Sequence, residues 1–374
     1  MKNFTLFFLL LLLFSCNNDD EENGPDDTFN SPDDLSREVV VENLNMPWGM
    51  TFLDASHALL TQKSGEIILV NVENGSSEQL FTVPNAVIQG QGGLLGIALS
   101  PNFESDNLFF VTYTKQQGGQ FTTALGKMTY QNSSVSNFEE IYVASAWSSS
   151  GAHFGSRITF DNAGYLYFSI GDRGAMNEAQ NTENEIGCVL RLNADGSVPT
   201  DNPFVNNEEV SDAIFTYGNR NIQGLVTHPE TGEIWSHEHG PQGGDEINLL
   251  KAGENYGWPL VTHGEQYGGG EISSDTTLPG MKDPLHHWTP SIAPSGMCII
   301  DGDIYSGWKG HVLTGALAGQ HLNRVIFNGT NYVTEKRYFQ GQGRIRDVVM
   351  CPTGHIYFIN ESEGAIFKVN PEFD

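Results

Sequence analysis

The chain has few basic residues for its length: 18 Lys and Arg against 46 Asp and Glu in 374 residues, for a formal net charge of −28. This excess of negative charge argues against binding to nucleic acid or to an anionic membrane surface. The scarce cations become informative for the same reason. Several arginines gathered at one place would form a local site for an anionic ligand.

Cysteine is also scarce. Beyond Cys16 the chain contains Cys188, Cys298 and Cys351, an odd number whose spacing fits no zinc motif. We expect buried, small apolar side chains, with one disulfide possible among them.

Sustained helical periodicity is missing as well. Only Glu183–Leu192 and Glu246–Leu250 have a pattern that would suit a helical turn or so. A mainly helical fold is therefore excluded.

The N-terminal apolar run from Phe4 to Phe14 is too short to span a bilayer and is typical of a signal-peptide core. It ends in Leu-Phe-Ser-Cys, which resembles a bacterial lipobox, so we expect residues 1–15 to be a lipoprotein signal and Cys16 to be lipidated. A secretory signal followed by a chance cysteine is the alternative. Asn17 follows, where Asp would retain a lipoprotein at the inner membrane, so we expect a cell-envelope protein anchored to the outer membrane, facing the periplasm or the surface.

Residues 16–36 are acidic and rich in Asn, Pro and Ser, a composition that cannot bury a core. We expect a disordered tether there and a folded domain over residues 37–374.

A loose repeat runs through this domain: a strand-like run, a short turn with Asp, Asn or Gly, and a second strand-like run. Its six equivalent positions are Gly49, Gly96, Arg157, Gly224, Gly296 and Asp347. Their spacing suits one four-stranded blade each, with insertions, and predicts an all-β, six-bladed β-propeller. REVVVENL and GAIFKVNP, near the two ends, are expected to pair and close the ring. A β-sandwich with similar hairpins is the alternative.

In a propeller the loops that enter the inner strands meet at one end of the central channel. The polar residues at this level are Gln91, His153, Arg220, Asn221, Gln223, Arg344 and Arg346. Converging guanidinium groups predict a ligand with several carboxylates or a phosphate, which arginine binds with paired hydrogen bonds. The alternative is that each arginine forms a bridge to an acid of a neighbouring blade.

Two further patterns, both of histidines, bear on possible chemistry. His153, at the same loop level, could accept a proton from an alcohol, although a lone histidine is more often structural. His237 and His239 are expected on alternate faces of one strand rather than at a metal.

Oxygen atoms gather near the Gly240–Pro241 turn, where Glu246, the neighbouring Asp245 and the Tyr256 backbone also lie. All-oxygen ligation suits Ca²⁺ better than Zn²⁺. A simple loop with exposed acids is the alternative.

Several segments in order resemble the glucose/sorbosone dehydrogenase family, quinoproteins that use pyrroloquinoline quinone (PQQ) on a six-bladed propeller. The matching segments include GQGGLLGIALSPNF, HFGSRITFDNAGYLYFSIGDRG, YGNRNIQGL, EHGPQGGDEINLLKAGENYGWP and GRIRDV. The resemblance is greatest to the aldose sugar dehydrogenase branch. It implies oxidation of aldoses at C1 to lactones by hydride transfer to PQQ, with an electron acceptor that the sequence does not identify.

The resemblance also implies roles at matching positions. His153 would be the general base, and Arg220 would stabilise charge as the quinone is reduced. Arg344 and Arg346 would hold PQQ carboxylates, with Gln91, Asp172, Asn221 and Gln223 completing the cofactor pocket. The carbonyls of Gly240 and Pro241 would bind a catalytic Ca²⁺, and Glu246 with the Tyr256 carbonyl would bind a second one.

Two positions depart from the classical glucose dehydrogenases of this family. Ala152 replaces an aspartate before the base, and a PQQ-contacting lysine of those enzymes would fall near Ala318. Two other functions therefore stay open at this point, a Ca²⁺-dependent propeller lactonase and a glycan-binding propeller without catalysis.

Overall fold

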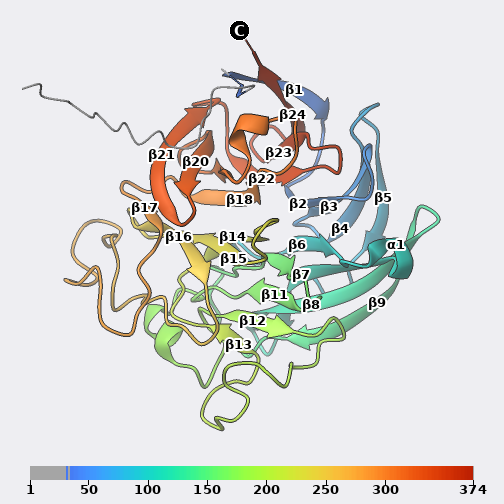
Figure 1. The fold of residues 1–374 in the computed structure, drawn as a ribbon. Helices are drawn as coiled ribbons and strands as arrows, with labels where there is room; N and C mark the ends of the chain where they lie inside the picture. Colours follow the sequence, from blue (N-terminus) through green and yellow to red (C-terminus); the bar gives the residue numbers. More distant parts are fainter. Residues whose placement is uncertain (1–30, 33, 374) are drawn as a thin grey trace, which may run out of the picture.

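The computed structural model describes residues 31–32 and 34–373. The predicted signal, Cys16 and most of the predicted tether lie outside these residues. Within them, 24 strands form six four-stranded antiparallel sheets around a central axis (Figure 1). The predicted six-bladed β-propeller is confirmed, and the sandwich alternative is wrong.

Each blade runs outward from an inner strand in chain order. Blades 1 and 2 comprise β2 (Pro47–Phe52), β3 (His57–Gln62), β4 (Glu66–Asn71), β5 (Ser77–Thr82), β6 (Leu94–Leu99), β7 (Leu108–Gln117), β8 (Gln120–Gln131) and β9 (Ser134–Val143). Blades 3 and 4 comprise β10 (Ile158–Phe160), β11 (Leu166–Ser169), β12 (Val189–Leu192), β13 (Ile214–Thr216), β14 (Ile222–Thr227), β15 (Ile234–Glu238), β16 (Asp245–Leu250) and β17 (His286–Trp288). Blade 5 comprises β18 (Pro294–Ile299), β19 (Val312–Ala316), β20 (Leu322–Asn328) and β21 (Asn331–Tyr338).

Blade 6 joins the two ends of the chain, as predicted. It contains β22 (Ile345–Met350), β23 (Ile356–Asn360), β24 (Ala365–Glu372) and, at its outer edge, β1 (Asp34–Val41). β1 pairs antiparallel with β24, with Arg37 opposite Val369. β1 begins three residues before the predicted domain boundary because Leu35 is buried in the core between blades 5 and 6.

The helical content is small, and the two helical turns considered above are strands or loop. Glu246–Leu250 lies in β16, and Glu183–Leu192 ends in β12. Short apolar runs do not distinguish the two structures by themselves, and ladder pairing on both sides decides for strand here. The short helical elements present are α1 (Phe103–Asp106) and 3₁₀ turns at Met176–Gln180 and Ser306–Trp308.

The cores lie between neighbouring blades. One such layer packs Phe110 and Leu125 of blade 2 against Phe168 and Leu190 of blade 3, all fully buried. Cys188, Cys298 and Cys351 are likewise buried. All three are free thiols, so among the described residues the possible disulfide does not form, and the cysteines serve as apolar packing.

The inner strands share a feature that the repeat did not reveal. In β2, β6, β14, β18 and β22 the ladder shifts register beside the repeat position. Such β-bulges redirect side chains next to functional sites. Here Trp48, Leu95, Gln223 and Arg346, at or beside the bulges, line one cavity.

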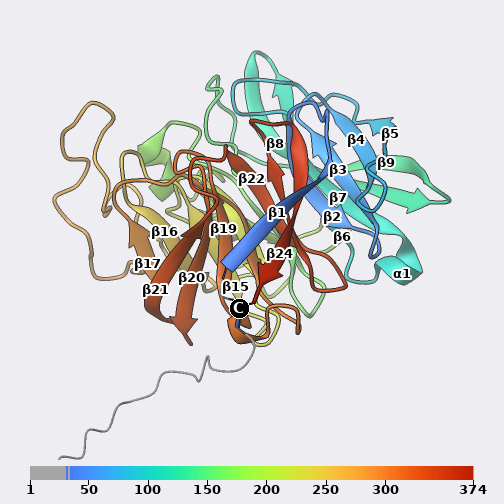
Figure 2. The same ribbon diagram turned by 90° about the horizontal axis from the view of Figure 1, so that it is seen from above.

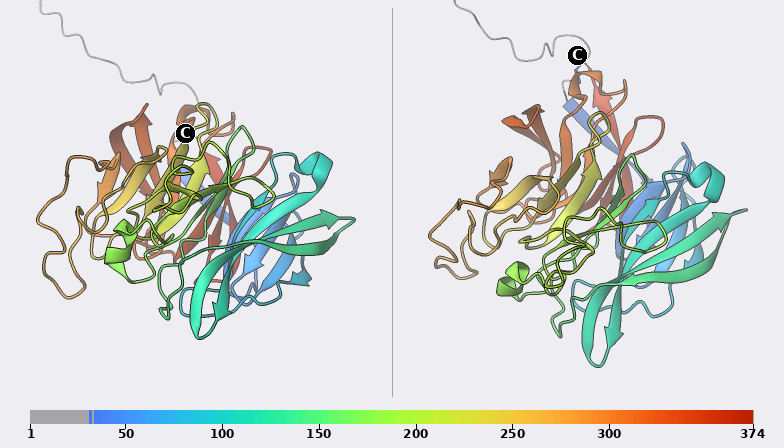
Figure 3. Two further views of the ribbon diagram at one scale, coloured as in Figure 1. Left: turned by 90° about the horizontal axis from the view of Figure 1, so that it is seen from below. Right: turned by 60° about the horizontal axis from the view of Figure 1, so that its bottom comes forward.

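The loops differ strongly in length. The connection between β16 and β17 stands away from the body of the propeller, and the long strands β7–β9 project beyond the other blades (Figures 2 and 3). Among the described residues, no helix has both the length and the apolar character needed to cross a membrane.

Candidate active site

A cavity of about 610 Å³ opens at one end of the central channel. All six blades contribute to its wall. Its polar and aromatic lining includes Trp48, Lys63, Gln91, Phe154, Asn221, Gln223, His239, Arg344, Arg346 and Glu361. The structure therefore brings Gln91, Asn221, Gln223 and the two arginines together at one cavity, whereas His153 and Arg220 lie beside its wall.

The two arginines of blade 6 share one carboxylate. Glu361 accepts hydrogen bonds from Nε of Arg344 at 2.5 Å and from Nε of Arg346 at 2.6 Å. The terminal nitrogens make longer contacts, 3.3 Å from Arg344 Nη1 to the Leu317 carbonyl and 3.3 Å from Arg346 Nη1 to Gln223 Oε1. One negative charge thus faces two positive charges, and a net positive charge remains beside the cavity.

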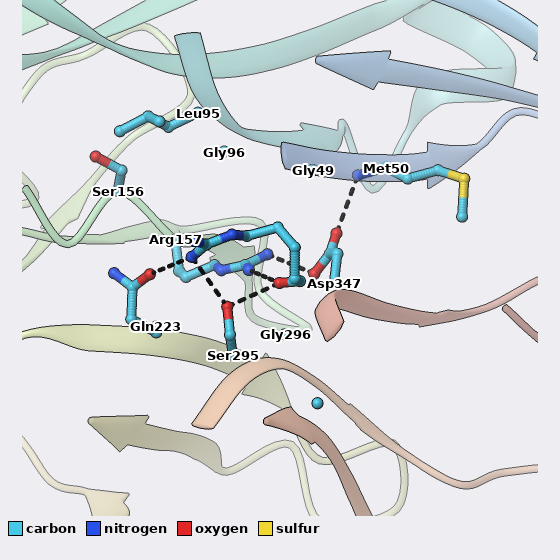
Figure 4. A network of polar contacts seen from close by, with 12 residues as sticks. Gly49, Met50, Leu95, Gly96, Ser156, Arg157, Gln223, Ser295, Gly296 and Asp347 are labelled. Carbon is cyan, nitrogen blue, oxygen red and sulfur yellow. Dashed lines mark hydrogen bonds and ion pairs between the residues drawn. The ribbon is translucent and has the colours of Figure 1, made fainter. Parts of the chain in front are cut away.

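A polar network that joins blades 1, 3, 5 and 6, here called the plug, lies in the central channel next to this cavity (Figure 4). Arg157 of blade 3 reaches across to Asp347 of blade 6, with Nη1 2.5 Å from Oδ1. The other Asp347 oxygen accepts the Met50 amide at 3.0 Å. Arg157 Nη2 and Ser295 Oγ both donate to the backbone carbonyl of Arg346, at 2.9 and 2.8 Å. The plug therefore fixes the backbone from which Arg346 projects.

His153 is held by a buried carboxylate. Its Nδ1 lies 2.5 Å from Oδ1 of Asp172, whose Oδ2 accepts a 2.9 Å bond from Trp258 Nε1. Burial opposes ionisation of Asp172, but the hydrogen bond from His153, electrostatic attraction to His153 and Arg220, and the Gly174 amide together lower its pKa below the usual range. A carboxylate at Nδ1 fixes the ring and leaves Nε2 to act on a ligand.

The backbone around this pair is unusually close. A Cβ at Gly171, the residue before Asp172, would lie 2.2 Å from the His153 carbonyl oxygen. His153 itself has a φ of 51° and donates its amide to Gln91 Oε1 at 2.8 Å. Glycine at position 171 is thus required for the His153 loop to reach Asp172.

Two amide side chains tie the His153 loop to blade 4. Asn221 Oδ1 accepts the Gly155 amide at 3.2 Å, and Gln223 Nε2 donates to the Gly155 carbonyl at 3.1 Å. Gln223 also accepts a hydrogen bond from Arg346, so it joins the His153 loop to the arginines of blade 6.

Arg220 lies at the predicted oxygen-rich turn. Its Nη1 donates to the carbonyls of His239 and Gly240 at 2.9 and 3.1 Å, and its amide donates to Glu238 at 2.5 Å. A Cβ at Gly240 would lie 2.0 Å from the Gly243 carbonyl oxygen, so this tight turn requires glycine. The turn is anchored by Asp245, which accepts the Gly240 amide at 2.8 Å.

A second, much smaller cavity of about 10 Å³ adjoins Arg220 and is lined by Glu238, Glu246 and Tyr256. Burial raises the pKa of Glu238 to about 7 and that of Glu246 well above its usual value, with repulsion between the two carboxylates adding to the shift of Glu246. Two carboxylates that resist ionisation together form a place where a hard cation would be stabilised.

Two expectations near this turn need correction. Asp245 has its oxygens occupied by Ser291 and by the amides of Ile292 and Ala293, so it is a structural anchor rather than a free metal ligand. His237 and His239 do not take alternate faces: both Nε2 atoms contact carbonyls of β18, because residues two apart in a strand point the same way. Within the described residues, no group of three or more His, Cys, Asp or Glu side chains could hold a metal.

Sequence reasoning missed Glu361, Lys63, Trp48 and Trp258. Glu361 follows Asn360, the last residue of β23, and lies next to the start of β22. The Arg-X-Arg pair with one acid a hairpin away was a usable signal. Lys63 lies in the β3–β4 turn, and no motif around it distinguishes it from the rest of the 18 basic residues.

These features define a propeller with an arginine-lined cavity at one end of its channel and an oriented histidine beside it. Its sequence matches the family model described as Glucose / Sorbosone dehydrogenase over residues 44–368. The chain belongs to this family and is an oxidoreductase.

Proteins similar to this chain include two sugar dehydrogenases. The aldose sugar dehydrogenase YliI of Escherichia coli (strain K12) is 34% identical over 91% of this chain and 94% of its own length. The quinoprotein glucose dehydrogenase B of Acinetobacter calcoaceticus is 28% identical over 90% and 87%.

Solved structures include the E. coli soluble aldose sugar dehydrogenase in its apo form, with a TM-score of 0.86, 34% identity and coverage of 90% of this chain and 100% of that one. The PQQ-bound aldose sugar dehydrogenase of Streptomyces coelicolor has a TM-score of 0.75 and 27% identity, and the alignment covers 91% and 99%. The chain is thus similar to sugar dehydrogenases along nearly its whole folded length.

Proposed function

We propose that the protein is a PQQ- and Ca²⁺-dependent dehydrogenase that oxidises aldose sugars at C1 to lactones. The observation that supports it most is the cavity at the mouth of the channel (the mouth cavity): Arg344 and Arg346 line it, and His153, which a buried carboxylate orients, lies beside its wall. The family resemblance supplies the identity of the cofactor.

The cavity suits PQQ in size and charge. Its volume falls in the range of roughly 300–1,000 Å³ typical of small-molecule sites. Arg344 and Arg346 share Glu361 and so retain positive charge for ligand carboxylates. Trp48 and Phe154 add flat apolar surface for a planar ring system.

When bound, PQQ supplies the two-electron oxidant that accepts hydride from C1. His153 takes the proton of the C1 hydroxyl at Nε2, while Asp172 stabilises the imidazolium that forms. Arg220, held against the turn carbonyls, places positive charge beside this pair and favours the build-up of negative charge on the acceptor.

Calcium fits the oxygen donors near Arg220. A carbonyl oxygen has two lone pairs, so the Gly240 carbonyl can accept from Arg220 and still bind a cation, with the Pro241 carbonyl beside it. Glu246 and the Tyr256 carbonyl are the proposed ligands of a second ion, and Glu238 adds a carboxylate to the same cavity. A Ca²⁺ held at the first site would act as a Lewis acid toward a carbonyl of the bound quinone.

Dye reduction with a panel of aldoses, after reconstitution with PQQ and Ca²⁺, tests this function. We expect turnover that requires both additions and lactone as the product. Lactone cleavage that needs no PQQ would favour the hydrolase alternative. Sugar binding without any turnover would favour the binding-module alternative.

The predicted envelope location also stays a proposal. Cys16 would carry the lipid that anchors the protein to the outer membrane, and the domain would act outside the cytoplasm. Replacing Cys16 by Ser should move the protein from the membrane fraction to the soluble one. An unchanged distribution would contradict the lipid anchor.

A further inference from the structure

Lys63 lies in the turn between β3 and β4 and lines the mouth cavity beside the blade 6 arginines. Its side chain is half-buried, and Nζ donates a 3.0 Å hydrogen bond to the Gly90 carbonyl. An ammonium group has three N–H donors, so this bond leaves two for another partner. Lys63 is thus placed as a compact positive charge at the edge of the cavity.

The charges around Lys63 favour an anion. The charged lining comprises Lys63, Arg344 and Arg346 against Glu361, three positive charges and one negative, a net of +2 in a chain of net −28. Burial lowers the pKa of Lys63, repulsion from Arg346 lowers it further, and Glu361 partly offsets this. An anion placed among these three cations would relieve their mutual repulsion.

The blade 5 wall of the cavity carries no charge at the position where the resemblance places a lysine of the classical glucose dehydrogenases. Leu317 lines the cavity, but the next residue is Ala318, which is exposed and carries no charge. Lys63 approaches the same cavity from blade 1 rather than from blade 5. Lys63 on blade 1 therefore supplies the cavity with a positive charge that blade 5 lacks at Ala318.

We propose that Lys63 is a third cationic ligand for the carboxylates of PQQ and takes the part of the lysine that is missing at Ala318. The inference rests on the proposed function. The competing role is structural, because the Gly90 carbonyl that Lys63 holds precedes Gln91, which contacts the His153 loop.

Titrating the full chain with PQQ in excess Ca²⁺, by calorimetry at several salt concentrations, tests the proposal. The variants are Lys63→Met and Lys63→Arg, with Lys309→Met as the control. Lys309 is an exposed lysine that pairs with Glu230 and Asp301 and does not line the cavity. Circular dichroism melting verifies that each variant is folded.

We expect Lys63→Met to bind PQQ about ten- to a hundredfold more weakly, as for loss of one charged hydrogen bond. Its affinity should also depend less on salt, because one ionic contact is lost. Lys63→Arg should stay close to the wild type, and Lys309→Met should match it.

Three results would overturn the proposal. Affinity within twofold of the wild type in Lys63→Met excludes a ligand role. Weak binding in both Lys63 variants, with the salt dependence of the wild type, indicates the structural role through Gly90. No PQQ binding by the wild-type chain would overturn the proposed function, and this inference with it.

Discussion

The mouth and the middle of the central channel both hold arginines, but the two regions pair them differently. In the middle, Arg157 has its own carboxylate, Asp347, at 2.5 Å, and it also donates a hydrogen bond to the backbone carbonyl of Arg346. At the mouth, Arg344 and Arg346 divide one carboxylate, Glu361, and face a cavity of about 610 Å³. The bridge between blades that was the alternative for the mouth arginines is found instead at Arg157.

This contrast separates stability from ligand binding. A buried ion pair with complete partners holds the blades together, whereas an excess of guanidinium groups is stable only beside solvent or an anion. The ratio of carboxylates to arginines therefore distinguishes a structural ion pair from a ligand site better than the presence of arginines does. Substitutions in the two regions should have different consequences.

The largest expected effect is on turnover. Replacing His153 by Ala should lower kcat by about 10²–10⁴-fold, because it removes the proton acceptor, while PQQ affinity changes little. Steady-state dye reduction and a PQQ titration measure the two quantities. His57→Ala, at a half-exposed histidine on blade 1, should leave both unchanged. Full turnover in His153→Ala would refute the assignment of the base.

The middle of the channel should respond through stability. Replacing Arg157 by Met leaves Asp347 buried without its partner, which costs about 3–5 kcal/mol of unfolding free energy. Arg344→Met, at a half-exposed side chain, should cost less than about 1 kcal/mol. Chemical denaturation measures both. Equal losses of unfolding free energy in the two variants would contradict the distinction between the two regions.

The mouth should respond through affinity. Arg346→Met removes a charged ligand and should weaken PQQ binding about ten- to a hundredfold. Equilibrium titration in Ca²⁺ gives the dissociation constant. Under conditions where Arg157→Met is folded, its loss of PQQ affinity should be smaller than that of Arg346→Met. The reason is that Arg157 acts only through the Arg346 backbone.

The smallest effect concerns pH. The pKa of Asp172 is lowered in the folded protein, so its ionised form stabilises the fold above the usual aspartate pKa of 3.8, and this stabilisation is lost as the pH falls through the folded-state value. Asp172→Asn should therefore be less stable than the wild type near pH 6, and the difference should shrink below pH 3.8. A pH series of thermal melts tests this. A difference that grows toward acid would contradict the assigned direction.

The propeller was predictable from the sequence because its repeat is local. Each copy is a hairpin with a short turn, so Gly49, Gly96 and Asp347 could be aligned without knowing any contact, and Figure 4 places them around the same channel. The convergence of Gln91, Asn221 and Arg346 followed from that alignment.

The other features depend on contacts that spacing does not encode. Glu361 binds Arg344 across a hairpin, and Asp172 reaches His153 only because Gly171 lets two loops approach. The bulges that turn Trp48 and Gln223 into the cavity, and the shared face of His237 and His239, likewise arise from strand register.

The most direct test of the mouth as a cofactor site is an absorbance titration of the purified protein with PQQ in the presence of Ca²⁺. The proposed function predicts a saturable change in the quinone spectrum that ends at one PQQ per chain and is weakened in Arg346→Met. A spectrum that equals the sum of free PQQ and protein at every ratio would contradict it.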